Sequence, residues 1–182
     1  MSVDLTHAVR FDLPRGSVHG AGEERAVLLP ASVFAELVLA AGPEVAVSIA
    51  LAMGESMGKR VAERLGGRDA VRQATLEAMV TALAAEVSLA GLGALSLERW
   101  GKAMLLVLHN VPAIEHKFLA ALFEGAIASS TGSRAHCAVV ASESGGVRIL
   151  VASAAGIDRV RGWISEGTGW GEALARLQGD ST

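Results

Sequence analysis

The most regular pattern of apolar and polar positions lies between residues 93 and 152. It predicts two strands, one helix and a second pair of strands, at residues 94–99, 103–109, 113–130, 134–142 and 147–152. The helix is apolar around most of its circumference, and only Lys117 and Glu124 form a clear polar strip. Such a helix must be covered on several sides. We therefore expect it to be the buried central helix of an α+β domain.

Three helices are predicted ahead of this unit. Apolar spacing, together with proline and glycine stop signals, places them at residues 31–41, 44–65 and 70–90, the last with Asp69 as its N-cap. Gly54 and Gly58 form a notch four residues apart, where another backbone could approach closely. Gly125, on the apolar side of the central helix, suggests close packing in the same way.

The two ends of the chain are less regular. Residues 9–29 predict small strands or an extended lead-in, and the tail predicts two short helices at residues 154–165 and 169–177. The expected fold class is α+β, with a helical layer on a small antiparallel sheet. Its order is helix-helix-helix-strand-strand-central helix-strand-strand-helix. We expect a single domain over residues 1–182, with a lead-in at 1–29 and a core at 30–178.

Composition adds one expectation about partners. Hydrophobic residues make up 51% of the 182 residues and charged residues 19%, which is more apolar surface than one small domain usually hides. We therefore expect a further buried face, through a homodimer or a lipophilic ligand. A net charge of −3 gives no electrostatic reason to bind nucleic acid.

Location is constrained by what the sequence lacks. A single cysteine excludes an intramolecular disulfide, in keeping with a reducing compartment. Residues 1–7 carry no secretory signal pattern, and acidic residues interrupt every apolar run before it reaches the length of a transmembrane segment. We expect a cytoplasmic protein without a transmembrane segment.

Cys137 is the first candidate for chemistry. It lies in a predicted strand directly after His136, and neighbouring strand residues point to opposite faces, so these two side chains do not form a catalytic pair. A buried structural cysteine is the favoured interpretation. A reactive or modified thiol, acylated or redox-active, is the alternative.

Metal and cofactor sites are not expected. The five histidines are scattered without the short spacing of a zinc site, at His7, His19, His109, His116 and His136. No glycine motif of the kind that binds phosphates or dinucleotides occurs. The sequence predicts no bound cofactor.

Glu86 stands alone in an apolar run of the third predicted helix. A half-buried carboxylate can act as an acid or base, but no nucleophile or second carboxylate lies nearby in sequence. A solvated edge or an interface hydrogen bond is the favoured interpretation. The densest basic run is expected to be a solvated face: Lys59, Arg60, Arg64, Arg68 and Arg72.

Methionine and aromatic residues at helical spacing usually fill a core, but methionines also suit a deformable apolar pocket. We interpret one such set as candidate lining of a ligand pocket beside the central helix. Its members are Met53, Met57, Met79, Leu83, Phe118, Leu122 and Phe123.

The order of elements resembles the four-vinyl-reductase (hydrocarbon-binding) domain family, and distantly the TRAPP vesicle-tethering subunits. The resemblance spans residues 31–165 and is carried by residues 93–99, 104–110, 118–127, 135–140 and 147–151. It implies a non-enzymatic module with an apolar cavity beside the central helix, often dimeric. Many members place cysteines around the last hairpin turn, where this chain has Ser142, Gly146 and Ile149, so no metal or thiol chemistry is carried over.

Three functions remain open from the sequence. The first is a homodimeric binding and regulatory module with an apolar pocket or seam, for a lipophilic small molecule or a protein partner. The second is a structural scaffold without a ligand. The third is an enzyme using Glu86, His109 or Cys137, which is disfavoured because no motif brings a nucleophile, a base and an orienting group together.

Overall fold

The computed structural model describes residues 8–20, 24–101, 103–144 and 146–179. The expectations for residues 1–7, and for Gly145 in the last hairpin turn, lie outside the described residues. The described elements follow in this order: β1 (Arg10–Asp12), β2 (Ser17–His19), β3 (Arg25–Ala26), α1 (Ala31–Ala41), α2 (Pro43–Arg64), α3 (Arg68–Gln73), α4 (Leu76–Leu89), β4 (Ala94–Trp100), β5 (Ala103–His109), α5 (His116–Thr131), β6 (His136–Glu143), β7 (Gly146–Ala152), α6 (Ala154–Ser165) and α7 (Trp170–Gly179).

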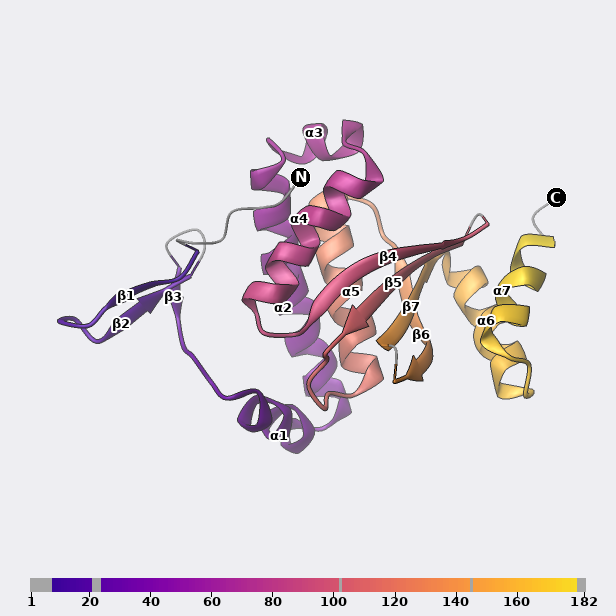
Figure 1. Cartoon of the computed structure of the whole chain (residues 1–182), viewed down its shortest axis with the longest axis horizontal. Helices are drawn as coiled ribbons and strands as arrows, with labels where there is room; N and C mark the ends of the chain where they lie inside the picture. Colours follow the sequence, from indigo (N-terminus) through magenta and orange to yellow (C-terminus); the bar gives the residue numbers. More distant parts are fainter. Residues whose placement is uncertain (1–7, 21–23, 102, 145, 180–182) are drawn as a thin grey trace.

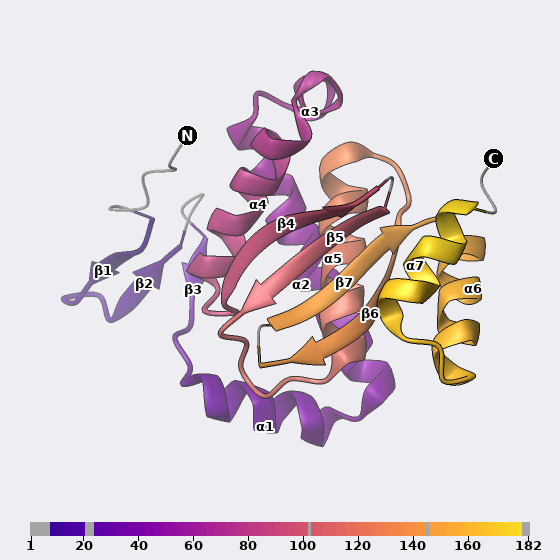
Figure 2. The same ribbon diagram turned by 45° about the vertical axis from the view of Figure 1, so that its right-hand side comes forward.

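The main sheet has four antiparallel strands in the order β4-β5-β7-β6 (Figure 2). Its interior strand β5 is apolar on both faces, as the sequence predicted. Leu106 and Leu108 belong to the larger core cluster, which includes α5, whereas Leu105 belongs to a second cluster with α6 and α7. The sheet is therefore packed between α5 on one face and the α6–α7 pair on the other. The expected α+β fold is confirmed.

Helix α5 is the buried central helix that the sequence predicted. It packs between the sheet and α2, and its fully buried side chains include Phe118 and Phe123. A Cβ atom added to Gly54 of α2 would collide with the carbonyl oxygen of Leu122, and one on Gly58 would collide with that of Ala126. The two helix backbones are thus in direct contact, which confirms the predicted notch.

The prediction of one continuous helix over residues 70–90 is wrong. The chain forms α3 and α4, separated by Ala74 and Thr75 in extended conformation. Thr75 caps α4, because its side-chain oxygen accepts a hydrogen bond from the backbone N–H of Ala78 at 3.2 Å. Asp69 lies inside the first turn of α3 and is not an N-cap; that position belongs to Gly67.

The N-terminal strands form a separate small sheet, in the order β1-β2-β3, which stands beside the body of the molecule (Figure 1). An extended segment, residues 27–30, connects β3 to α1. We call residues 8–20 and 24–29 the N-terminal arm. Small strands or an extended lead-in were expected here, and the described residues hold three short strands followed by this extended segment.

The remaining bounds agree with the sequence to within three residues. The tail helices α6 and α7 were predicted, and Ser153 caps α6 by accepting a hydrogen bond from the N–H of Gly156 at 3.2 Å. Within the described residues, no helix combines the length and the apolar character needed to cross a membrane.

Candidate ligand-binding site

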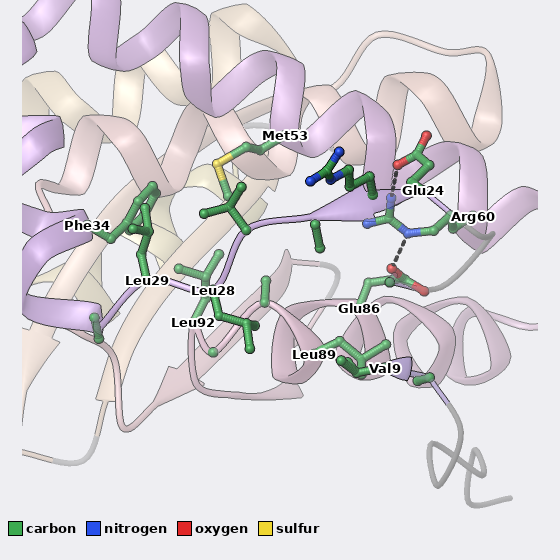
Figure 3. A pocket seen from close by; sticks show the side chains of 18 of the residues that line it. Val9, Glu24, Leu28, Leu29, Phe34, Met53, Arg60, Glu86, Leu89 and Leu92 are labelled. Atoms are coloured by element: carbon green, nitrogen blue, oxygen red, sulfur yellow. Dashed lines mark hydrogen bonds and ion pairs between the residues drawn. The ribbon is translucent and has the colours of Figure 1, made fainter. Parts of the chain in front are cut away.

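A cavity of about 420 Å³ lies between the N-terminal arm and the helical body (Figure 3). One wall is the extended segment that joins β3 to α1. The opposite wall comes from the C-terminal end of α4 and the turn that follows it, and α2 contributes Met53 and Arg60. Figure 3 shows Leu28 of the arm opposite Met53, with Leu92 below them.

Most of the lining is apolar. These side chains come from the arm, α1, α2, α4 and the following turn, together with the loop after β5: Ala8, Val9, Ala26, Val27, Leu28, Leu29, Ala31, Phe34, Met53, Leu89, Ala90, Leu92 and Pro112. Four charged residues also line the cavity, namely Glu24, Arg25, Arg60 and Glu86. A concave, largely apolar site with a few polar groups is typical of small-molecule pockets.

The buried carboxylate of Glu86 organises the polar end of the cavity. It is 1% exposed and accepts two hydrogen bonds of 2.7 Å, from Arg60 Nε and from Arg64 Nη2. Arg60 Nη1 also donates to Ser56 Oγ at 2.7 Å. A carboxylate of this burial is stable as an anion only when it is paired and hydrogen-bonded, and both arginines meet that need.

This cluster corrects two expectations from the sequence. The solvated edge expected for Glu86 is wrong; the alternative of an interface hydrogen bond holds, between α4 and α2. The basic run is likewise not a uniformly solvated face, because Arg60 and Arg64 lie one helical turn apart on α2 and both reach Glu86. Two other members bond to the end of α5, where Arg68 donates to the Ser129 carbonyl at 3.3 Å.

The residues proposed from sequence for a pocket are divided between cavity and core. Met53 lines the cavity. The most buried of the others belong to the core cluster: Met57, Leu83, Phe118, Leu122 and Phe123. Met79 is partly buried on α4. Phe118 lies one side chain behind the cavity wall, because its ring packs edge-to-face on that of Phe34, with centroids 5.8 Å apart.

Cys137 is a buried free cysteine, 1% exposed. Burial, with a smaller contribution from the carboxylate of Glu124, raises the pKa of its thiol from 9.0 to about 12. Its backbone N–H donates to Glu124 Oε1 at 2.8 Å. A thiol that is inaccessible and protonated at neutral pH is a poor nucleophile, which favours the structural interpretation of Cys137.

None of the four histidines within the described residues lines the cavity. His109 Nε2 is 3.3 Å from Ser96 Oγ, and His136 Nδ1 is 3.9 Å from Glu124 Oε1. No group of three or more potential metal ligands occurs among the described residues. Glu86, His109 and Cys137 lie on α4, β5 and β6, and only Glu86 lines the cavity.

Comparison with solved structures identifies a known fold. The chain is similar to the phenol-responsive sensory domain of the transcription activator PoxR, whose crystal structure holds phenol. The TM-score is 0.61 at 16% sequence identity, over 95% of this chain and 92% of that domain. The two proteins share a fold. No protein-family profile and no curated protein matches the chain.

Sequence reasoning missed most of the cavity lining. Residues 26–29 form a short apolar run that was noted only as a piece of strand, yet Val27 and Leu28 remain 81% and 60% exposed beside the cavity. An apolar run that follows the charged residues 23–25 and ends at Pro30 was the available signal. The arginine partners of Glu86 are 22 and 26 residues away in sequence, and no local pattern connects them to it.

Proposed function

We propose that this protein is a non-enzymatic regulatory module that binds a lipophilic small molecule between its N-terminal arm and its helical body. The cavity is the single observation that carries this proposal. At about 420 Å³ it has the size of pockets that hold small organic ligands, of about 300–1,000 Å³. Thirteen apolar side chains and four charged ones line it, so burial of an apolar ligand would supply most of the binding free energy.

Two further observations support a sensing role. The PoxR domain, which has the same fold, is described as phenol-responsive and belongs to a transcription activator. The order of elements also resembles the hydrocarbon-binding family. We therefore propose that ligand binding in this chain is a signal to be transmitted and not the first step of a reaction, because no nucleophile and base converge on the cavity among the residues that the structure describes.

Of the residues proposed from sequence, we assign Met53 direct contact with the ligand. Phe118 supports the site from behind by holding the ring of Phe34, which lines the cavity. Four others belong to the apolar core behind that wall, namely Met57, Leu83, Leu122 and Phe123, whereas Met79 is partly buried on α4.

We further propose that the protein works as a homodimer. Nine of its exposed large hydrophobic residues lie on the arm and α1: Val9, Phe11, Leu13, Val27, Leu28, Leu29, Val33, Leu37 and Leu39. We call them the exposed apolar surface. A surface of this kind is typical of a protein–protein contact. Because it shares Val9, Val27, Leu28 and Leu29 with the cavity lining, occupation of the cavity would alter the surface that a second copy meets.

Native mass spectrometry tests both parts of the proposal. We expect a dimer that carries a non-covalent adduct, either as purified or after incubation with N-phenyl-1-naphthylamine, an apolar neutral probe. The adduct should disappear when the same sample is denatured. A dimer that takes up no probe would overturn the ligand-binding function and favour a scaffold, the second candidate, which the exposed apolar surface alone would explain.

A further inference from the structure

The charges at the polar end of the cavity do not balance. Arg25 and Arg60 line it, and Arg64 contacts Glu86 from behind. Against these three cations stand two carboxylates, Glu24 and Glu86. The cluster has one excess positive charge, and this charge lies beside an otherwise apolar cavity.

Arg60 has hydrogen-bonding capacity left on the side of the arm. Its Nε donates to Glu86 and its Nη1 to Ser56, both at 2.7 Å. Among the described residues Nη2 makes no hydrogen bond. The side chain is 23% exposed and lies between Glu86 and Glu24 (Figure 3).

Glu24 occupies this side of Arg60 only loosely. Its Oε2 is 3.6 Å from Arg60 Nη1, which is an ion-pair distance and too long for a hydrogen bond. The Glu24 side chain is also 71% exposed. An exposed pair of this kind contributes little stability and is easily replaced. By contrast, Glu86 is fixed by two short hydrogen bonds and stays in place.

From this arrangement we infer that the ligand is an amphipathic carboxylate, whose head binds Arg60 in place of Glu24 while its apolar tail fills the cavity. A carboxylate can accept two parallel hydrogen bonds from one guanidinium, which is stronger than the present ion pair. Displacement of Glu24 leaves Arg25, Arg60 and Arg64 opposite Glu86 alone, so the cluster then favours an anionic head group over a neutral one. This inference rests on the proposed function.

The test compares two ligands of equal chain length, octanoate and octan-1-ol, by isothermal titration at pH 7.5. They differ in the head group alone. We expect octanoate to bind at least tenfold more tightly, and its affinity to fall with added salt. The full chain is used throughout.

Variants locate the head group. Glu24→Gln removes the competing carboxylate from an exposed position, so folding should be unaffected, and octanoate affinity should rise at least threefold while octanol affinity stays constant. Glu166→Gln is the matched control, because it changes net charge equally at the end of α6, on the other side of the molecule (Figure 1).

The outcomes separate this inference from the proposed function. Equal affinity for octanoate and octanol, or an octanoate affinity that Glu24→Gln leaves unchanged, would overturn the carboxylate head and keep the apolar pocket. Binding of neither ligand, with no uptake of N-phenyl-1-naphthylamine, would overturn the pocket itself.

Discussion

Arg60 Nε lies 2.7 Å from Glu86 Oε2 across the contact between α2 and α4. Glu86 is buried, with 1% of its side chain exposed, whereas Arg60 also pairs with Glu24 of the arm. The ion pair therefore connects the buried part of α4 to the arm side of the cavity. A single arginine therefore contacts a buried anion that cannot leave and an exposed one that can. This difference makes Arg60 the residue through which a bound ligand would affect the arm.

Loss of the buried charge should cost stability. Glu86→Gln takes the buried anion away from Arg64 and leaves Arg60 only its loose ion pair with Glu24, and breaking a buried pair is strongly destabilising. Because both arginines can regain some water, we expect a loss at the low end, about 2–3 kcal/mol, in urea unfolding.

Glu172→Gln is the matched control for that change. It breaks an exposed pair with Arg176 on α7, and should cost about 0.5 kcal/mol or less. Equal losses for the two variants would contradict the role assigned to Glu86.

The close contact of α2 with α5 should be intolerant of a single methyl group. Gly54→Ala would drive a Cβ atom into the carbonyl oxygen of Leu122, and backbone cannot rotate away as a side chain can. We expect a loss of about 2 kcal/mol or more in the free energy of unfolding.

Gly162→Ala in α6 is the control for packing, because a Cβ atom there meets nothing within 4 Å. Helix propensity alone should make it neutral or stabilising by up to about 1 kcal/mol. If Gly54→Ala behaved in the same way, the two helices would not be in direct backbone contact.

Cys137 should be unreactive in the folded protein. Its thiol is buried and its pKa is raised to about 12, so iodoacetamide should not label it at pH 8 until guanidinium unfolds the chain. Rapid labelling under native conditions would restore the reactive alternative.

The same pKa shift predicts how stability changes with pH. Above pH 9 the unfolded thiol loses its proton while the folded one keeps it, so the unfolded state binds fewer protons. The contribution of Cys137 is therefore complete below pH 9 and is lost as pH rises towards 12. The chain has no tyrosine, whose ionisation would overlap this range. Cys137→Ala should remove this part of the pH dependence in thermal unfolding.

The exposed apolar surface should hold the dimer together. Leu13 and Leu39 are 81% and 68% exposed and do not line the cavity, so a charge at either position should not disturb the fold. We expect the double variant Leu13→Glu, Leu39→Glu to be monomeric in size-exclusion chromatography with light scattering, at unchanged melting temperature. Gln73→Glu, an exposed change of charge on α3, should remain dimeric. A double variant that stays dimeric would place the interface elsewhere.

Much of the fold was predictable because it is encoded in local patterns. The circumferential apolarity of α5 and the doubly apolar strand β5 each require cover on two sides, and both have it. The break at Ala74 and Thr75 was not predicted, because residues 70–90 contain no glycine or proline to mark it. The hydrogen bond from the Ala78 N–H that caps α4 is a feature of the structure alone.

The candidate site was less predictable, for a physical reason. The cavity forms where an irregular segment packs back on the body, and the position of Leu28 relative to Met53 depends on tertiary contacts (Figure 3). The same applies to Glu86. The isolation of Glu86 in an apolar run was visible in the sequence. Its partners Arg60 and Arg64 were not, because they lie on two successive turns of a different helix, α2.

The central claim is that the cavity under the arm binds an apolar ligand, and fluorescence titration with N-phenyl-1-naphthylamine tests it most directly. Leu28→Asp places a charge in the cavity wall at a 60% exposed position, and Val45→Asp places one at a 52% exposed position on α2 that does not line the cavity. We predict saturable binding to the unmodified protein, the same affinity in Val45→Asp, and at least tenfold weaker binding in Leu28→Asp. No saturable binding, or equal affinity in all three proteins, would contradict the account.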